Sequence, residues 1–112
     1  MADLDPSAHN ALTVDVRRYD GTVVIRLCGD LDLAGFDEAR AAIDAALGSQ
    51  PRRVILDTTA LDYMDSSGIV LLVQVARAAQ QVQVRNPRPI VRRLIELTGL
   101  SGMLQITDDD NA

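Results

Sequence analysis

Aromatic residues are scarce in this chain of 112 residues, which has no Trp, one Phe and two Tyr. Aliphatic side chains must therefore build the core, and the length is enough for one domain but not for two. The single cysteine, Cys28, cannot form an internal disulfide, and its apolar neighbours favour a buried hydrophobe over a reactive thiol. Nothing in the sequence requires an oxidising compartment.

Long apolar runs and an excess of basic charge are also absent. No stretch is apolar over enough residues to span a membrane, and the polar, acidic residues 1–10 do not resemble a signal peptide. All basic residues are Arg, and the formal net charge is −5, whereas nucleic-acid binding needs a basic surface. We therefore expect a cytoplasmic protein that contacts neither membranes nor nucleic acids.

Most of the groups that enzymes use are missing as well. The one histidine, His9, lies in the N-terminal segment, where it cannot serve as a rigidly held base for a serine nucleophile. No cluster of His and Cys has zinc-binding spacing, and no glycine-rich phosphate loop is present. Asp30 and Asp32 are close in sequence, but such a pair alone does not make a metal or acid–base site. We predict no catalytic residue, no metal site and no cofactor, and hence a protein that acts by being bound.

The first part of the chain predicts an antiparallel hairpin. Loose alternation of apolar residues indicates a strand over 12–19, and Asp20-Gly21 is typical of a two-residue turn that leads into a second strand over 22–28. Apolar residues at three- and four-residue spacing predict a helix over 34–47. The nearly continuous apolar run over 53–57 is typical of a strand in a parallel sheet.

The rest of the chain alternates between helix and strand. The predicted elements are a loop over 58–65, a helix over 66–80, a strand over 82–85, a helix over 89–98 and a short strand over 104–106. We therefore predict one α/β domain over 12–106, with an N-terminal antiparallel hairpin joined to a mixed, mostly parallel sheet of four or five strands with three or four helices. Residues 1–11 are predicted to be a flexible tail, and 107–112 an acidic tail.

One local group stands out, Asp65-Ser66-Ser67-Gly68 ahead of an apolar helix. Asp and Ser are both good N-cap residues, so the group has a purely structural interpretation. It also has a functional one, because a serine hydroxyl at a helix start is accessible to a kinase. The free N–H groups and the dipole of the helix would tolerate a phosphate there. Its charge of about −1.5 to −2 would still disturb a bound partner, so it would switch binding without unfolding the domain.

Three segments, in this order and at this spacing, carry a resemblance to a known family: Gly29-Asp30-Leu31-Asp32-Leu33-Ala34, Val54-Ile55-Leu56-Asp57 and Met64-Asp65-Ser66-Ser67-Gly68. They closely resemble the STAS-domain anti-sigma-factor antagonists of bacteria. The run 94–100 also resembles the last helix of that family and its exit. The resemblance covers nearly the whole domain, from about 12 to 106.

The resemblance implies a partner-switching cycle. In this family the unphosphorylated antagonist binds an anti-sigma factor that is also an ATP-dependent serine kinase, in its ATP-bound or ADP-bound state, and so frees the sigma factor. The kinase then phosphorylates the antagonist, which ends binding, and a serine phosphatase resets the cycle. By motif position the phosphorylated residue is Ser66, and Asp32, Asp65, Ser67 and Gly68 are expected to contact the partner. The resemblance also implies that the free protein is a monomer.

Two features depart from the family pattern. Ile69-Val70 replaces the Leu-Gly that often follows Ser-Ser-Gly, and Gln80-Gln81 lacks the usual glycine. Neither involves the serine, so both bear on the identity of the partner rather than on the mechanism. Two other functions stay open: a STAS-like scaffold or ligand-sensing module that is not phosphorylated, and a hydrolase with Ser66 as nucleophile, which would need His9 as its base.

Overall fold

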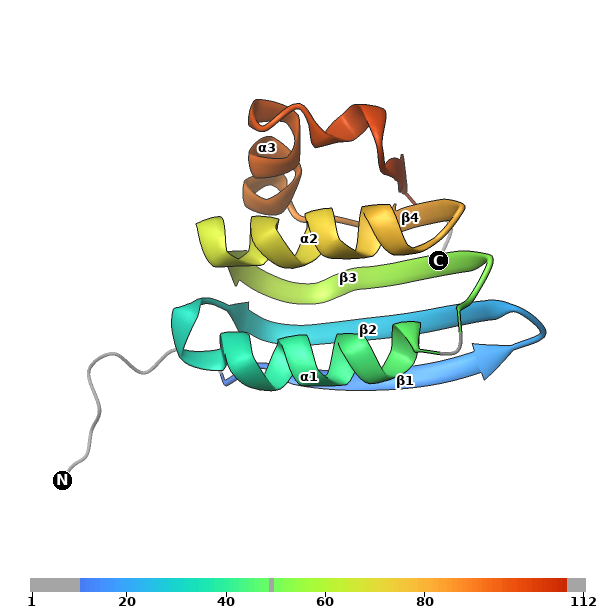
Figure 1. The fold of residues 1–112 in the computed structure, drawn as a ribbon. Coiled ribbons are helices and arrows are strands. Elements are labelled where there is room, and N and C mark those ends of the chain that lie inside the picture. The colour runs from blue at the N-terminus through green and yellow to red at the C-terminus, as the bar shows by residue number, and fades with distance from the viewer. Residues whose placement is uncertain (1–10, 49, 109–112) are drawn as a thin grey trace, which may run out of the picture.

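The strands form one mixed sheet in the order β1-β2-β3-β4-β5 (Figure 1). The computed structural model describes residues 11–48 and 50–108. β1 is antiparallel to β2, and β2 to β5 are parallel to one another. This confirms the predicted α/β fold with its N-terminal antiparallel hairpin. The elements are β1 (Thr13–Tyr19), β2 (Thr22–Leu31), the 3-10 turn η1 (Leu33–Gly35), α1 (Phe36–Leu47), β3 (Arg53–Met64), α2 (Ser66–Ala78), β4 (Gln81–Arg85), α3 (Pro89–Leu97), the 3-10 turn η2 (Leu100–Gly102) and β5 (Gln105–Thr107).

The hairpin turn between β1 and β2 has the predicted geometry. Asp20 and Gly21 have φ values of 39° and 83°, and a two-residue turn of this kind needs positive φ at both positions. Tyr19 and Thr22 face each other across the turn. The turn therefore sets the register of the whole β1–β2 pair, in which Thr13 reaches Cys28.

The predicted loop over 58–65 is wrong, because β3 continues as a strand to Met64. Thr58, the first residue of the predicted loop, is 1% exposed, and its hydroxyl donates a hydrogen bond of 2.8 Å to the backbone oxygen of Arg85. A buried polar side chain needs such a partner. The partner lies on β4, so a short sequence window could not reveal it.

β2 is also longer than predicted and ends at Leu31. Its pairing with β3 shifts register twice, next to Cys28 and after Gly29. Each shift interrupts the two-residue alternation by which a strand is recognised in a sequence. Cys28 is only half-buried, although the sequence predicted a buried side chain. The extended β2 and β3 end together, with Leu31 paired to Met64.

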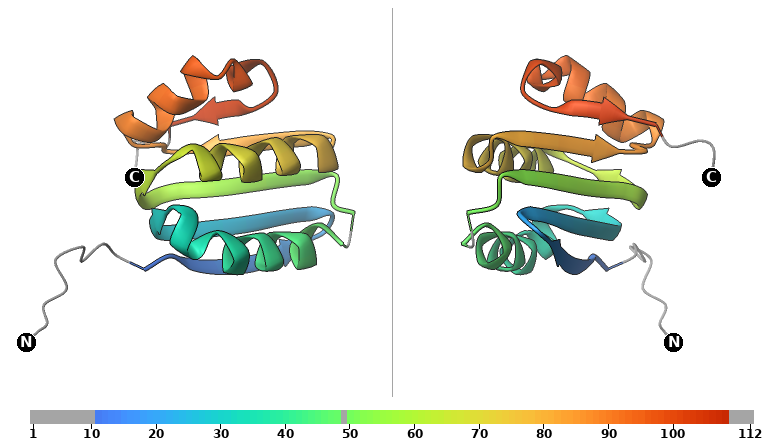
Figure 2. Two further views of the ribbon diagram at one scale, coloured as in Figure 1. Left: turned by 60° about the vertical axis from the view of Figure 1, so that its left-hand side comes forward. Right: turned by 90° about the vertical axis from the view of Figure 1, so that its right-hand side faces the viewer.

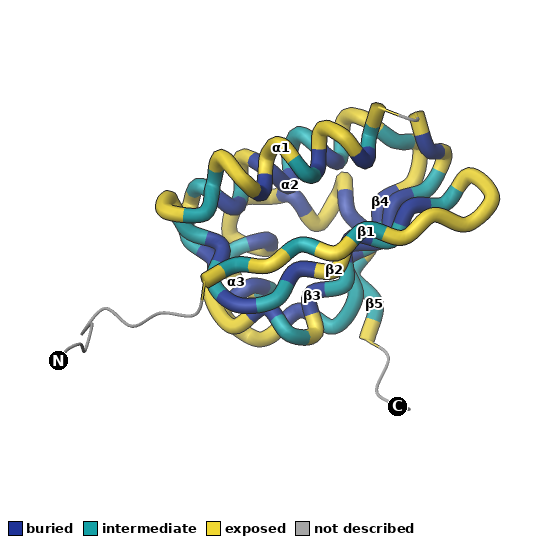
Figure 3. Tube along the Cα trace, turned by 90° about the horizontal axis from the view of Figure 1, so that it is seen from below, coloured by how far each residue is buried: buried dark blue, intermediate teal, exposed yellow. Residues whose placement is uncertain are grey.

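The two faces of the sheet differ in chemistry. α1 and α2 lie side by side over one face (Figures 1 and 2), and buried and more exposed residues alternate along the strands (Figure 3). Buried strand residues of the helix-covered face include Val23, Ile25, Leu27, Val54, Leu56, Val82 and Val84. The strand residues that alternate with this face point to the opposite face and are mostly polar and incompletely buried. They include Asp15, Arg17, Arg26, Arg53, Asp57, Gln83 and Arg85.

α2 buries the residues that its sequence pattern indicates. Leu72 is 3% exposed and Val75 is fully buried, which confirms the predicted orientation of this helix. Val70, on the other side, is 56% exposed. No helix in the described part of the chain is long and apolar enough to cross a membrane.

The predicted tails lie largely outside the described residues. Of the predicted N-terminal tail over 1–11, only Ala11 is described. At the other end, Thr107 belongs to β5, and Asp108 accepts hydrogen bonds from Arg92 Nη2 at 2.5 and 2.7 Å. The last strand thus ends at Thr107, one residue beyond the predicted end of the domain at 106.

Candidate partner-binding site

The candidate residues meet where two neighbouring parallel strands end. β2 leads into η1 through Asp32, and β3 leads into α2 through Asp65. A backbone hydrogen bond of 3.2 Å from Asp65 N to Leu31 O joins the two exits. The carboxyl ends of parallel strands are a common position for binding sites, because two helix starts converge there. The structure therefore brings together the two predicted segments that the sequence separates by a helix and a strand.

Asp65 is the N-cap of α2. Its Oδ1 accepts hydrogen bonds from Ser67 N at 2.8 Å and from Ser67 Oγ at 2.5 Å. Burial raises the pKa of the Asp65 carboxyl, but the two bonds from Ser67 and the backbone N–H groups of Leu33 and Gly68 outweigh burial and hold the pKa below its ordinary value. A fixed negative charge therefore lies at the start of α2 at neutral pH.

The two adjacent serines are in opposite situations. Ser66 is the first residue of α2 and is exposed, and its hydroxyl makes no hydrogen bond to any of the residues that the structure describes. Ser67 is partly buried, and its hydroxyl donates to Asp65. Of the pair, Ser66 thus offers the hydroxyl that an approaching enzyme can reach.

Gly68 lies in the core beneath the serines. A Cβ atom at this position would be 2.2 Å from Met64 Cγ and 3.1 Å from Leu31 Cδ2. Only glycine therefore lets α2 approach the ends of β2 and β3 this closely. Its expected contact with a partner stays a prediction, while its packing role is direct.

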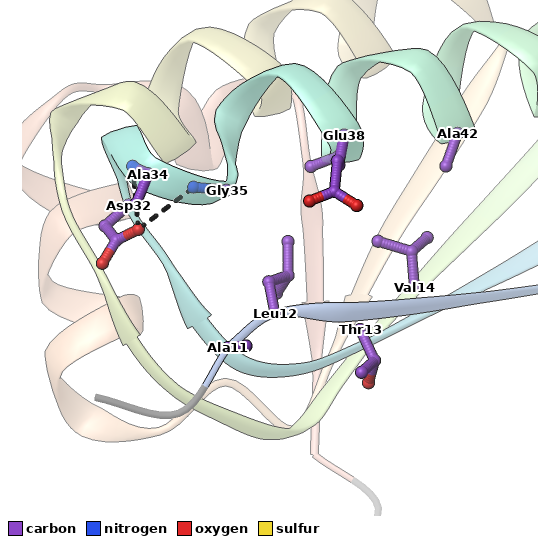
Figure 4. A pocket seen from close by; sticks show the side chains of 10 residues that line it. Ala11, Leu12, Thr13, Val14, Asp32, Ala34, Gly35, Glu38 and Ala42 are labelled. Carbon is purple, nitrogen blue, oxygen red and sulfur yellow. Dashed lines mark hydrogen bonds between the residues drawn. The ribbon is translucent and has the colours of Figure 1, made fainter. Parts of the chain in front are cut away.

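Asp32 lies at the start of η1, where its Oδ1 accepts hydrogen bonds from Ala34 N at 3.1 Å and Gly35 N at 3.3 Å. It also borders an open groove of about 410 Å³ between the start of β1 and α1. Figure 4 shows this groove, with Leu12 and Val14 on one side and Glu38 on the other. Asp32 is thus both a structural cap and a surface charge.

Three exposed apolar side chains lie near the site, and the sequence analysis missed two of them, Leu33 and Tyr63, as candidate contacts. Leu33 follows Asp32 and is 76% exposed, and Tyr63 near the end of β3 is 42% exposed. Val70 lies one helical turn after Ser66, on the same face of α2. The one available signal was the departure of Val70 from the family pattern. Leu33 gave none, because an apolar residue at a helix start usually packs inward.

The described residues hold no group of three or more His, Cys, Asp or Glu side chains that could bind a metal ion. Among these residues the site offers the exposed Ser66 hydroxyl, the carboxylates of Asp32 and Asp65, and exposed apolar side chains. Such a surface suits recognition by another protein.

Comparison with protein families identifies the domain. The family model described as the STAS domain matches residues 13–110. The chain belongs to the STAS domain family. Among the relatives of this STAS domain is the anti-sigma F factor antagonist of Lysinibacillus sphaericus, which is 33% identical over 96 residues, or 81% of this chain and 82% of the relative.

Solved structures share the fold. An anti-sigma factor antagonist from Mycobacterium paratuberculosis is 25% identical, with a TM-score of 0.79 over 86% of the STAS domain chain and 85% of its own. The anti-sigma factor antagonist SpoIIAA in its unphosphorylated form is 28% identical, with a TM-score of 0.73 over 88% of this chain and 91% of its own. SpoIIAA of Bacillus is also known in a phosphorylated form, with a TM-score of 0.68 to this chain.

Proposed function

We propose that this STAS domain is an anti-sigma-factor antagonist. In its unphosphorylated form it binds an anti-sigma-factor serine kinase and frees the sigma factor, and phosphorylation of Ser66 ends that binding. The observation that carries the proposal is the exposed Ser66 hydroxyl, which makes no hydrogen bond within residues 11–48 and 50–108, beside a Ser67 hydroxyl that donates to Asp65. Relatives named as anti-sigma factor antagonists, and a phosphorylated form of one of them, support it.

The electrostatics of the site suit a switch that acts on binding. A phosphate on Ser66 would lie at the N-terminus of α2, where the helix dipole favours negative charge, so the fold should tolerate it. The same phosphate would add about −1.5 to −2 charge next to Asp65, which is already ionised. A partner packed on Leu33 and Val70 would then meet a hydrated double charge and dissociate.

Partner recognition in this proposal combines charge with apolar contact. Asp32 and Asp65 supply negative charge, so the kinase should present basic groups to the carboxyl ends of β2 and β3. Leu33, exposed by 76%, would be an apolar anchor in the complex. The cycle further needs a serine phosphatase. The chain itself would supply no catalytic group and no cofactor, and would act in the cytoplasm.

The test starts from capture of the kinase with Ser66→Ala as bait in the presence of Mg-ADP, followed by reconstitution with purified proteins. We expect the kinase to phosphorylate the wild type and Ser67→Ala, but not Ser66→Ala. Ser66→Asp should bind the kinase more weakly while its circular dichroism stays native. An aspartate carries less charge than a phosphate, so a partial loss of affinity is the expected result.

Two results would count against the proposal. Phosphate transfer to Ser66→Ala would place the modification elsewhere. A natively folded Ser66→Asp that binds the kinase as well as the wild type would remove the switch. A chain that binds other regulators but never carries phosphate at Ser66 would favour the scaffold or sensing module instead.

A further inference from the structure

β1 forms an edge of the sheet, and half of its backbone groups point away from β2. Tyr19 and Thr22 flank the two-residue turn and therefore form a hydrogen-bonded pair. Bonded and non-bonded pairs alternate along an antiparallel ladder, so Val14, Val16 and Arg18 direct their N–H and C=O groups toward the free edge. β1 has seven residues and no proline, so this edge can accept another strand.

We infer that a second copy of this chain occupies the edge, with the two β1 strands antiparallel about a twofold axis through Val16. Only registers that pair the outward groups with each other are possible. An axis through Val14 or Arg18 would pair only three residues of each seven-residue strand, so the charges need to decide only among the axes through Asp15, Val16 and Arg17. An axis through Asp15 would place two carboxylates face to face, and an axis through Arg17 two guanidinium groups. With the axis through Val16, Asp15 of each copy lies opposite Arg17 of the other copy, so two pairs of opposite charge form.

The charges involved are available for this contact. Within one chain Arg17 Nε lies 3.2 Å from Asp15 Oδ2, and both side chains are more than half exposed. An exposed pair of this kind contributes little by itself. In the dimer each carboxylate would be flanked by two guanidinium groups, one from its own strand and one from the second copy.

The groove between β1 and α1 supplies the second half of the interface. In the proposed register the second copy's Arg18 lies opposite Val14 and on the same face, because paired residues share a face of the sheet. Val14 lines the groove together with Glu38 and the small Ala42, and Figure 4 shows the Glu38 side chain above β1. Neither Arg18 nor Glu38 forms an ion pair within the described residues. The groove therefore has room and charge for that guanidinium.

The predicted dimer is weak. Two seven-residue strands and two grooves make a small interface, so we expect a dissociation constant on the order of 100 μM. At lower concentration the chain would be the monomer that the family resemblance implies. The association does not depend on the proposed function.

Sedimentation equilibrium of the full chain, from about 10 μM to about 1 mM, tests whether two copies dimerise through β1. We expect the wild type to dimerise, and Asp15→Arg or Arg17→Asp to weaken the dimer by at least about tenfold. The double variant, with both charges exchanged, should recover wild-type association. A chain that is monomeric throughout, or an Asp15→Arg variant that dimerises normally, would overturn the inference. Thermal unfolding of each variant confirms that the fold is intact.

A second exchange tests the groove. Arg18→Glu should also weaken the dimer, and adding Glu38→Arg should restore it. No effect of Arg18→Glu would overturn the assignment of the groove to Arg18.

Cross-linking tests the register in a Cys28→Ala background. Val16→Cys lies on the twofold axis and should form a disulfide with its own copy under mild oxidation, because the paired Cα atoms would be about 5.5 Å apart. Val14→Cys faces Arg18 of the second copy and should not. Equal cross-linking of the two variants would refute the register.

Discussion

Two helix starts, which follow the carboxyl ends of β2 and β3, have the same sequence pattern, Asp-X-X-Gly, but different structures. Asp32-Leu33-Ala34-Gly35 forms a single 3-10 turn before α1, whereas Asp65-Ser66-Ser67-Gly68 leads directly into α2. Both aspartates cap the backbone that follows. Asp65 accepts from the backbone N–H of Ser67 at 2.8 Å and also from the Ser67 hydroxyl at 2.5 Å, whereas Asp32 accepts from two backbone N–H groups at 3.1 and 3.3 Å.

The glycines explain much of this difference. Gly68 is packed against Met64 so closely that no Cβ fits, whereas a Cβ on Gly35 would lie 3.4 Å from Leu12 Cβ, an ordinary contact. The first residue after each aspartate is exposed, as an apolar Leu33 at one start and a hydroxyl-bearing Ser66 at the other. The same local pattern thus yields a closely packed start that presents a hydroxyl group and a less closely packed start that presents an apolar side chain.

The largest effect should come from the core that α2 covers. Leu72→Ala removes a side chain that is 3% exposed and should lower the free energy of unfolding by about 2–5 kcal/mol. Val70→Ala, two residues away and 56% exposed, should change it by less than about 0.5 kcal/mol. Urea unfolding followed by circular dichroism measures both. Equal losses would mean that α2 is oriented differently.

Substitution of each glycine by alanine compares directly how closely the two helix starts are packed. Gly68→Ala should cost about 1–3 kcal/mol, because the new methyl group overlaps Met64 and Leu31. Gly35→Ala has space and an ordinary φ of −98°, so it should be within about 0.5 kcal/mol of the wild type. Thermal and urea unfolding give the two values. A harmless Gly68→Ala would show that α2 can move away from the strand ends.

The caps should differ by less. Asp65→Ala should cost about 1–2 kcal/mol and Asp32→Ala about 0.5–1 kcal/mol, since the backbone N–H bond that Asp65 accepts is shorter than those that Asp32 accepts. The reverse order in urea unfolding would contradict this ranking of the two starts.

The Asp65 contribution should depend on pH. Because folding lowers the pKa of Asp65, its stabilisation is fully present above the ordinary carboxyl pKa of about 3.9 and is lost as the pH falls through the lower pKa of the folded state. The stability difference between the wild type and Asp65→Asn, measured by urea unfolding, should therefore be constant near neutral pH and shrink in acid. A difference that grows on acidification would contradict the sign of the shift.

The smallest effects should distinguish the two serines. Ser67→Ala loses a hydrogen bond to an ionised carboxylate and should cost about 0.5–1.5 kcal/mol. Ser66→Ala removes a hydroxyl with no bond to the described residues and should stay within about 0.5 kcal/mol. Calorimetry of the two variants against the wild type resolves this difference. A larger loss for Ser66→Ala would assign it a structural role.

Local sequence signals determined most of the fold. The Asp20-Gly21 turn, the orientation of α2 around Leu72 and the Pro89 start of α3 were all predicted correctly, because hairpin turns, helix faces and first-turn prolines depend on neighbouring residues. The motif around Ser66 was likewise recognised from its residues alone.

Only the tertiary structure decided the rest. The strand from Thr58 to Met64 depends on pairing with β2 and on a hydrogen bond to Arg85, which are distant in the chain. The different states of Ser66 and Ser67 depend on the direction in which Asp65 points, and two adjacent identical residues carry no signal for that. The sequence specified these side chains, and the packing of parallel strand ends determined which of them stay free.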